Sequence, residues 1–369
     1  MEEKEAFLIF NHIKGLDVKK ISSLLDHFGS ATKILEASLA DLCEILDCQE
    51  TAQRVALWKE ADGWKKDLET VFKQGAQVIP FNDLLYPSNL RILSDPPIVL
   101  YVSGEIAPDD LKKALGVVGT RQCSNYGTEM ARQLSADLAA GGLTIVSGLA
   151  RGIDTAAHQG ALSCGRTIAV LGSGIANLYP RENDGLAQKI KEKGALVSEL
   201  PMLTPPSKYQ FPRRNRLVSA LSIGVLLIEA PLKSGAMITM QLAHVQDKRC
   251  FALPGRADID AFRGNHALIK TRKAELVESA SDIFTAIPKN LLNLDLSIMK
   301  DRQISFDGLA LEEKEIFQLL RDGELSIEEL VLQTKWPIAK LSSQLMKLVL
   351  KEKIQELPGK LYKLSKGAS

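Results

Sequence analysis

The sequence is poor in cysteine and contains no long hydrophobic run. Its five cysteines are odd in number and scattered through 369 residues, and no histidines cluster beside them. Their spacing matches no zinc motif, so we expect no disulfide framework, no metal site and no cofactor, only reduced thiols. No segment approaches the roughly 18 apolar residues that a membrane helix needs. The first ten residues begin acidic, so we expect no signal peptide, no membrane contact and a cytoplasmic protein.

Net charge is also nearly absent, because 46 Lys and Arg face 45 Asp and Glu and leave +1. A nucleic-acid binder is expected to be basic, so this average argues against one. The charges are unevenly spread, however. Residues 1–72 hold 9 basic and 14 acidic side chains, or −5, whereas residues 330–369 hold 8 and 2, or +6. The net charge is therefore an average over segments of opposite sign. Binding of nucleic acid would depend on local basic segments and not on the charge of the whole chain.

The pattern of apolar residues divides the chain into four parts. Residues 1–75 have the spacing of short helices, and residues 76–288 form the large central part. Residues 289–308 are polar and weakly periodic, which is typical of a linker, and residues 309–369 predict a compact helical unit. The length of the chain fits two or three domains.

The central part alternates short apolar runs, each ending in small residues, with helical segments. Six runs have this form: 115–119, 143–148, 167–172, 195–200, 223–230 and 250–255. Between them we expect helices at about 126–140, 155–163, 184–193 and 236–246. Such alternation predicts an α/β fold, an extended Rossmann-like doubly wound parallel sheet, with strand-like pieces at 78–79 and 98–102 ahead of it. In this architecture ligands bind at the carboxyl ends of the strands.

The two terminal modules are predicted to be small and helical. The stretch 13–45 is similar to a helix-hairpin-helix (SAM-like) module, but Asp17 stands where the second glycine of the hairpin would be. A carboxylate there disfavours DNA contact, so we favour a packing or partner domain. In the last part we expect helices near 312–320, 326–333 and 337–352, then a two-stranded turn at 354–364. That order is typical of a winged helix.

Four loops at strand ends carry small residues where each strand turns into a helix. They are Gly119-Thr120-Arg121, the run from Ser147 through Gly148, Arg151 and Gly152 to Asp154, Gly172-Ser173-Gly174, and Ser234-Gly235-Ala236. Backbone without Cβ atoms can approach an anion closely, and N–H groups at helix starts point toward it. The dinucleotide fingerprint is not met, and the sequence has no P-loop or nucleophile elbow.

A basic and aromatic segment follows the fourth apolar run. It reads Lys208-Tyr209-Gln210-Phe211-Pro212-Arg213-Arg214-Asn215-Arg216. Arg forks fit phosphate oxygens and aromatic rings stack on bases, so this mixture favours single-stranded nucleic acid. A second acid-free stretch, 263–273, contains Asn265 and Lys270. Each feature taken singly has a structural explanation: Phe211 as a core anchor, Asp154 as a helix cap, or the arginines as solvated or ion-paired surface.

The central part closely resembles the DprA/Smf (DNA-processing protein A) family over roughly residues 80–285. The resemblance is carried by residues 118–121 and 147–154, Phe211 with 214–216, and by 234–235, 254–255, 264–265 and 268–269. It implies an extended Rossmann domain that binds single-stranded DNA, and a dimer that contacts the recombinase RecA and loads it on incoming DNA in natural transformation. It further implies that Arg121, Lys208 and Phe211 contact the DNA. The basic run 270–273 departs from the family pattern, which usually has Gly-Ala there.

The hypothesis from the sequence is therefore a single-stranded DNA binder and recombination mediator that is not an enzyme and has no catalytic residues. The alternative is a Rossmann-type hydrolase acting on nucleoside monophosphates, suggested by Glu229 at a strand end and by the glycine-rich loops. For the C-terminal module two alternatives remain open: it binds duplex DNA, or it binds a protein partner. The expected DNA contacts are Gly119, Thr120, Arg121, Ser147, Gly148, Arg151, Gly152, Lys208, Phe211, Arg213, Arg214, Asn215, Arg216, Ser234, Gly235, Asn265 and Lys270.

Overall fold

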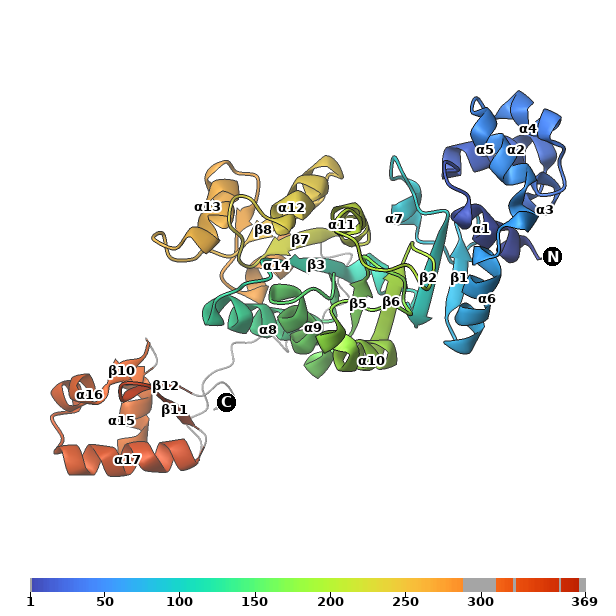
Figure 1. The fold of residues 1–369 in the computed structure, drawn as a ribbon. Helices are drawn as coiled ribbons and strands as arrows, with labels where there is room; N and C mark the ends of the chain where they lie inside the picture. Colours follow the sequence, from blue (N-terminus) through green and yellow to red (C-terminus); the bar gives the residue numbers. More distant parts are fainter. Residues whose placement is uncertain (1, 288–309, 321–322, 352, 365–369) are drawn as a thin grey trace. The chain divides into compact units, whose positions relative to one another are not determined.

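The computed structural model describes residues 2–287, 310–320, 323–351 and 353–364. These residues form two compact units, the first within 2–287 and the second within 310–364 (Figure 1). The predicted linker at 289–308 lies outside the described residues. No helix in the described part of the chain is long and apolar enough to cross a membrane.

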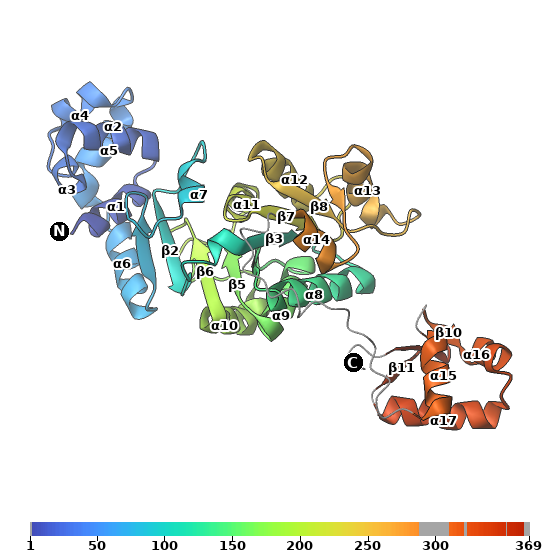
Figure 2. The same cartoon turned by 180° about the vertical axis from the view of Figure 1, so that it is seen from behind.

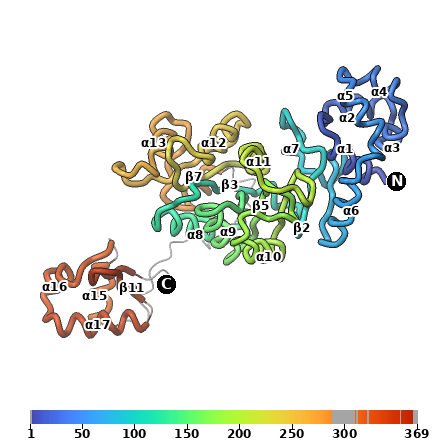
Figure 3. The backbone as a smooth tube through the Cα atoms, viewed as in Figure 1, coloured from blue at the N-terminus to red at the C-terminus, as the bar shows by residue number. Residues whose placement is uncertain are grey.

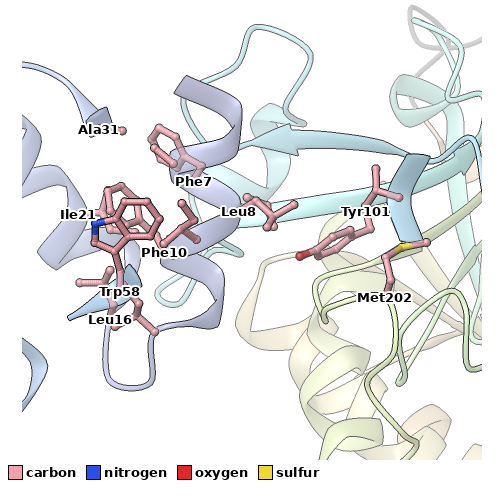
Figure 4. Packing of buried hydrophobic residues seen from close by; sticks show 14 of the residues in the cluster. Phe7, Leu8, Phe10, Leu16, Ile21, Ala31, Trp58, Tyr101 and Met202 are labelled. Carbon is pink, nitrogen blue, oxygen red and sulfur yellow. The ribbon is translucent and has the colours of Figure 1, made fainter. Parts of the chain in front are cut away.

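The first unit begins with a cluster of short helices: α1 (Glu3–His12), α2 (Val18–Phe28), α3 (Ala31–Ile34), α4 (Leu39–Ile45), α5 (Gln49–Ala56), the 3-10 turn Trp58–Glu60 and α6 (Gly63–Lys73). Asp17 caps α2 by accepting a hydrogen bond from the backbone N–H of Lys20, and Gly29 ends that helix with φ +82°. The carboxylate in the predicted hairpin is thus an N-cap. Phe7 and Phe10 pack with Trp58 in the middle of the cluster (Figure 4).

A sheet of nine strands forms the centre of the first unit. Its strands lie in the order β1-β2-β6-β5-β4-β3-β7-β8-β9. The strands from β6 to β9 are mutually parallel, whereas β1 and β2 are added antiparallel at one edge. Their bounds are β1 (Gln77–Pro80), β2 (Val99–Gly104), β3 (Ala114–Val118), β4 (Thr144–Ser147), β5 (Thr167–Val170), β6 (Gly194–Ser198), β7 (Gly224–Leu227), β8 (Arg249–Ala252) and β9 (Glu275–Leu276).

Helices cover both faces of this sheet. On one face lie α8 (Asn125–Ala140), α9 (Ile153–Cys164), α10 (Asp184–Lys193) and α14 (Ala280–Ala286) (Figure 2). On the other lie α11 (Gln210–Ala220), α12 (Gly235–Val245) and α13 (Arg263–Lys270), with α11 and α12 side by side (Figure 3). The short α7 (Ser88–Arg91) contacts α11, and 3-10 turns occur at Leu111–Lys113, Arg181–Asn183 and Asp260–Phe262.

Alternation along the strands explains the two-sided core. Ile168 and Val170 of β5 are buried on the side of α11 and α12. Ala169 and the following Leu171 are buried on the opposite side, with α10. Strands buried on both faces read as continuous apolar runs, which is why the sequence predicts them. Each of the six predicted runs overlaps a parallel strand, and the doubly wound fold is confirmed. The strand-like pieces at 78–79 and 98–102 become β1 and β2.

The second unit has the predicted winged-helix order. It contains α15 (Leu311–Leu319), β10 (Leu325–Ser326), α16 (Ile327–Thr334), α17 (Ile338–Leu350), β11 (Ile354–Leu357) and β12 (Leu361–Leu364). The predicted two-stranded turn gains a third strand, because β10 pairs antiparallel with β12. Leu330, Leu341, Leu345 and Leu348 pack with Tyr362 in its core.

Candidate nucleic-acid interface

A cavity of about 780 Å³ lies at the carboxyl end of the parallel strands. Its walls come from the loops that follow β3, β4 and β7 and from the side of α11. Along the chain the strands advance from β3 to β6 and then return to β7, which pairs with the opposite edge of β3. The cavity therefore opens at the point where the strand order reverses, the position at which open α/β sheets bind ligands.

One side of α11 faces the cavity. Phe211, Arg214, Asn215 and Val218 line the cavity and follow the helical spacing i, i+3, i+4, i+7. The predicted basic and aromatic segment is therefore split by helical geometry. Within the segment, Arg214 and Asn215 line the cavity, whereas Arg213 and Arg216 do not.

Aromatic rings and cations meet at Phe211. The guanidinium carbon of Arg121 lies 4.8 Å from the centroid of the Phe211 ring, and the Tyr179 ring centroid lies 5.8 Å from it. Tyr179 is 40% exposed and Phe211 is half-buried. Arg121, Tyr179 and Phe211 also line an adjoining cavity of about 220 Å³, to which Arg151 contributes. Flat π-faces beside a cation are suited to a base and its neighbouring phosphate.

The opposite wall is the start of α12. Ser234 caps this helix by accepting a hydrogen bond from the backbone N–H of Met237 at 3.3 Å. Gly235 and Ala236 then line the cavity, and a Cβ atom on Gly235 would meet nothing within 4 Å. Lys233, which is exposed, lies just ahead of the cap. A helix N-terminus with an adjacent ammonium group favours an anion.

Two buried ionisable side chains, Arg214 and Asp154, line the cavity. Arg214 donates hydrogen bonds to the carbonyl oxygens of Gly148, at 2.6 Å, and Val170. Burial lowers the pKa of Arg214 to about 10, and the charge of Asp154 opposes that fall. Burial raises the pKa of Asp154, which accepts hydrogen bonds from the backbone N–H groups of Gly148 and Ala150. Arg214 thus remains a cation at neutral pH and joins the loop after β4 to α11.

Two glycines in the strand-end loops make room for side chains of the protein itself. A Cβ atom on Gly148 would collide with the guanidinium of Arg214, and one on Gly172 would lie 2.7 Å from Cδ1 of Phe211. Only a residue without a side chain therefore lets Arg214 and Phe211 take their positions. The expectation from the sequence is different, namely that the glycines of these loops let the backbone approach an anion. Among the glycines of the four loops, Gly235 fits that expectation, because a Cβ atom there would meet nothing within 4 Å.

The structure brings most of the expected contact residues together. Those that line the main cavity are Gly119, Thr120, Arg121, Gly148, Lys208, Phe211, Arg214, Asn215, Ser234 and Gly235. Arg151 lines the adjoining cavity, where its guanidinium is paired with Glu182 at 2.8 Å. Arg121 and Lys208, by contrast, form no ion pair with any described residue.

Six expected residues lie outside both cavities: Ser147, Gly152, Arg213, Arg216, Asn265 and Lys270. Ser147 is buried and donates to the Val117 carbonyl oxygen at 2.6 Å. Gly152 has φ +75° and packs against the Thr120 carbonyl oxygen. The Asn265 side chain is fully hydrogen-bonded to the backbone: its oxygen accepts from the N–H of Ala230, and its amide nitrogen donates to the carbonyl oxygens of Leu227, Ile228 and Leu253. Lys270 is exposed at the end of α13.

Arg213 and Arg216 lie on another face of α11, where acids neutralise them. Arg216 pairs with Glu199 at 2.6 Å, and Arg213 lies 3.5 Å from the same carboxylate. Asp95 lies within 3.6 Å of both guanidinium groups. Burial raises the pKa of Glu199, and the two arginines oppose that rise. The ion-pair explanation that the sequence left open therefore describes these two residues.

Glu229, the residue that suggested an enzyme, is engaged elsewhere. Its carboxylate is buried and accepts hydrogen bonds from the Ser124 hydroxyl at 2.7 Å and from the Ser124 backbone N–H at 3.1 Å. It therefore fastens the start of α8 and does not line the cavity. Among the described residues, no three His, Cys, Asp or Glu side chains are grouped closely enough to hold a metal ion.

Sequence reasoning missed two cavity residues that matter chemically, Tyr179 and Lys233. Tyr179 lies between Leu178 and the Pro180-Arg181 pair, and this aromatic residue beside a basic one after the third strand end was a usable signal. Lys233 directly precedes the Ser234-Gly235 helix start that the sequence did single out.

Comparison with known proteins places these features in a family. The family model for DNA recombination-mediator protein A matches residues 77–288, and the DprA winged-helix model matches residues 306–360. Protein Smf from Escherichia coli K12 is 37% identical over 295 residues, which cover 78% of this chain and 77% of that protein.

Two solved structures agree with this assignment. DNA processing protein A from Streptococcus pneumoniae matches with a TM-score of 0.66 and 31% identity, over 78% of this chain and 99% of that one. A Helicobacter pylori DNA processing protein A, whose structure was described for its single-stranded DNA binding mode, matches with a TM-score of 0.53 and 32% identity, over 58% of this chain and 97% of that one. The chain belongs to the DNA recombination-mediator protein A family, whose members are named DprA or Smf.

Proposed function

We propose that this protein binds single-stranded DNA in the cavity at the carboxyl end of its sheet. The observation that carries the proposal is that two kinds of side chain alternate around one opening: cations that form no ion pair with any described residue, and aromatic rings that line the cavity. Arg121, Lys208 and Lys233 supply positive charge, while Phe211 and Tyr179 supply stacking faces. Cations attract the phosphates, and rings of this kind bind a base regardless of its identity.

The geometry favours a single strand over a duplex. The rings lie within a cavity between loops and α11, where only an unpaired base can reach them. The Helicobacter pylori relative, described for single-stranded DNA binding, supports the same choice.

The wider role that we infer is that of a recombination mediator. In this role the protein, as a cytoplasmic homodimer, protects incoming single-stranded DNA and loads RecA on it during natural transformation. It does so without catalysing a reaction. The family description as a recombination mediator supports this role. The competing hypothesis, hydrolysis of nucleoside monophosphates, loses its main motivation because Glu229 is bonded to Ser124 and does not line the cavity.

Fluorescence anisotropy with labelled oligothymidylates of increasing length, at two salt concentrations, tests the proposal. We expect affinity to rise with length until the site is filled and to fall as salt rises. Unlabelled single strands should compete well, and duplexes and nucleoside monophosphates poorly. Equal competition by nucleoside monophosphates, or release of free base from them, would favour the hydrolase instead.

For the winged-helix unit, we propose that a protein partner is contacted in preference to duplex DNA. The exposed side of α17 includes Ile338, Met346 and Leu350, with exposed fractions of 59%, 61% and 77%. Two lysines of this unit are neutralised, because Lys340 pairs with Glu312 and Lys351 with Glu313, each at 2.6 Å. An apolar face with reduced positive charge suits a protein surface better than a phosphate backbone.

A further inference from the structure

A buried carboxylate links the N-terminal helices to the sheet. Asp67 lies in α6 and is 2% exposed. Its Oδ2 atom accepts a hydrogen bond from the hydroxyl of Tyr101 in β2 at 2.6 Å and lies 3.0 Å from Nε2 of His12 in α1. Its Oδ1 atom accepts from the backbone N–H of Met202 at 2.6 Å. One side chain thus joins two helices, one strand and the segment that follows β6.

Met202 belongs to the segment that carries the proposed DNA contacts. This segment, residues 199–209, runs from the end of β6 to the start of α11 and includes Lys208. The Met202 peptide is held on both sides, because its carbonyl oxygen accepts a hydrogen bond from the backbone N–H of Ala176 at 3.0 Å. Figure 4 shows Leu8 on the side of α1 that faces Tyr101, with Met202 beside the Tyr101 ring.

The same segment has two further anchors. The side-chain amide of Asn11 in α1 donates to the carbonyl oxygen of Glu199 at 3.2 Å, and the Glu199 carboxylate pairs with Arg216 of α11. The backbone N–H of Gly174 donates to the carbonyl oxygen of Thr204 at 2.9 Å. Through Ala176 and Gly174 these bonds also fix the loop that contains Gly172, against which Phe211 packs, and continues to Tyr179.

We propose that the N-terminal helices are part of the DNA-binding machinery, and that Asp67 is the positioning residue through which they act. The inference rests on the proposed single-strand binding. Asp67 fixes Met202, Met202 fixes both loops beside it, and those loops set where Lys208, Phe211 and Tyr179 meet the ligand. Asp67 is buried and accepts hydrogen bonds from Tyr101 and Met202, so removing this acceptor would leave buried donors unsatisfied and loosen the link.

The test uses the full chain and a double-mutant cycle. Asp67→Ala should weaken binding of an oligothymidylate by about 2- to 30-fold. In the double variant with Phe211→Ala, the fold-loss of affinity should be clearly smaller than the product of the two single fold-losses. Part of the effect of Asp67→Ala comes from displacing the Phe211 ring, and that part disappears when the ring is absent. Combined with Lys233→Ala, which lies on the opposite wall, the losses should multiply to within about 2-fold.

Two comparisons separate positioning from loss of stability. Asp67→Asn keeps an acceptor for the Met202 N–H and should restore most of the affinity. Asp110→Ala removes another buried carboxylate, one bonded to Arg166 and Thr144 away from the cavity, and should lower thermal stability without coupling to Phe211→Ala. Amide hydrogen exchange should accelerate at residues 202–207 in Asp67→Ala and stay unchanged there in Asp110→Ala.

Three outcomes are decisive. Asp67→Ala with wild-type affinity and unchanged exchange at residues 202–207 would overturn the inference, as would full multiplication of its effect with that of Phe211→Ala. If Asp67→Ala does not fold, Tyr101→Phe replaces it in the same cycle with the same expected sign. This variant removes the hydroxyl that donates to Asp67 and accepts from the Asn11 amide. Absence of oligothymidylate binding by the wild-type protein would overturn the proposed function itself, which is a different result.

Discussion

Arg121 and Phe211 share one wall of the cavity, with the guanidinium carbon 4.8 Å from the centroid of the ring. The first residue follows β3 and the second lies in the first turn of α11, so the fold brings them together from distant parts of the chain. The pairing keeps a cation beside a stacking face. A base bound on Phe211 would therefore have a phosphate-binding group next to it.

We predict that Phe211→Ala weakens single-strand binding substantially. Loss of one stacked base costs about 1–3 kcal/mol, which corresponds to roughly 5- to 150-fold in the dissociation constant. Phe211→Leu preserves apolar contact with Gly172 but has no π-face, so it should bind weakly while keeping near-normal thermal stability. Anisotropy titrations and thermal melts measure the two effects. Wild-type affinity in Phe211→Leu would show that the ring is only a packing residue.

We further predict that the salt dependence of binding falls when a phosphate contact is removed. Each of Arg121→Ala, Lys208→Ala and Lys233→Ala should reduce the slope of log affinity against log salt by about 0.7. Arg213→Ala is the matched control, because its guanidinium already faces Asp95 and Glu199. A slope change in Arg213→Ala as large as in the other three would mean that the DNA path crosses the outer side of α11.

Much of the fold could be predicted from the sequence because strands buried on both faces leave continuous apolar runs. The runs at 167–172 and 223–230, for example, contain β5 and β7. The edge strand β9 has only two residues and the strand β10 also has two, too few to leave a period. The attachment of α1 and α6 to β2 through Asp67 also left no signal, because a single buried Asp in an amphipathic helix looks like any polar residue.

The sequence predicts the residues that line the cavity better than it separates them from their neighbours along the chain. The family resemblance and the chemistry of the side chains predict DNA contacts at Arg121, Lys208 and Phe211, and all three line the cavity. The sequence predicts contacts at Arg213 and Arg216 as well, because both lie in the basic segment 208–216. Its helical period would have separated them, since residues 211, 214, 215 and 218 share one face. The amide of Asn265 could bind a ligand, which is why the sequence predicts a contact there. Its actual hydrogen-bond partners are backbone groups, and they depend on how β7, β8 and α13 pack.

For the winged-helix unit we predict that Met346→Glu leaves duplex affinity of the full chain unchanged to within about 2-fold. Met346 is exposed on α17, the helix that a DNA-binding winged helix would place in the major groove. A carboxylate there would repel phosphates, so a duplex-binding role for this face predicts a loss of about tenfold or more. Anisotropy with a labelled duplex distinguishes the two outcomes, and Lys347→Glu on the same helix provides a second position.

His158 of α9 is fully buried. Nδ1 of His158 lies 2.7 Å from the hydroxyl oxygen of Thr167, and that hydroxyl donates to the Ile145 carbonyl oxygen. Nδ1 must therefore carry the proton that is donated to Thr167, while Nε2 is buried without a hydrogen-bond partner among the described residues. Burial, together with the smaller effect of the nearby charge of Arg214, lowers the pKa of His158 to about 3.

A lowered imidazole pKa makes the folded state less stable in acid. Between pH 6.5 and about 3, the unfolded chain binds a proton at His158 that the folded chain does not, so stability falls as pH falls. From pH 7 to pH 5 this contributes a loss of about 2 kcal/mol in the free energy of unfolding. His158→Asn keeps a donor for Thr167 and removes the titration, so urea unfolding at the two pH values should show a smaller loss in the variant. His27→Asn, at an exposed position, should behave like the wild type, and equal pH dependence in wild type and His158→Asn would contradict a neutral buried imidazole.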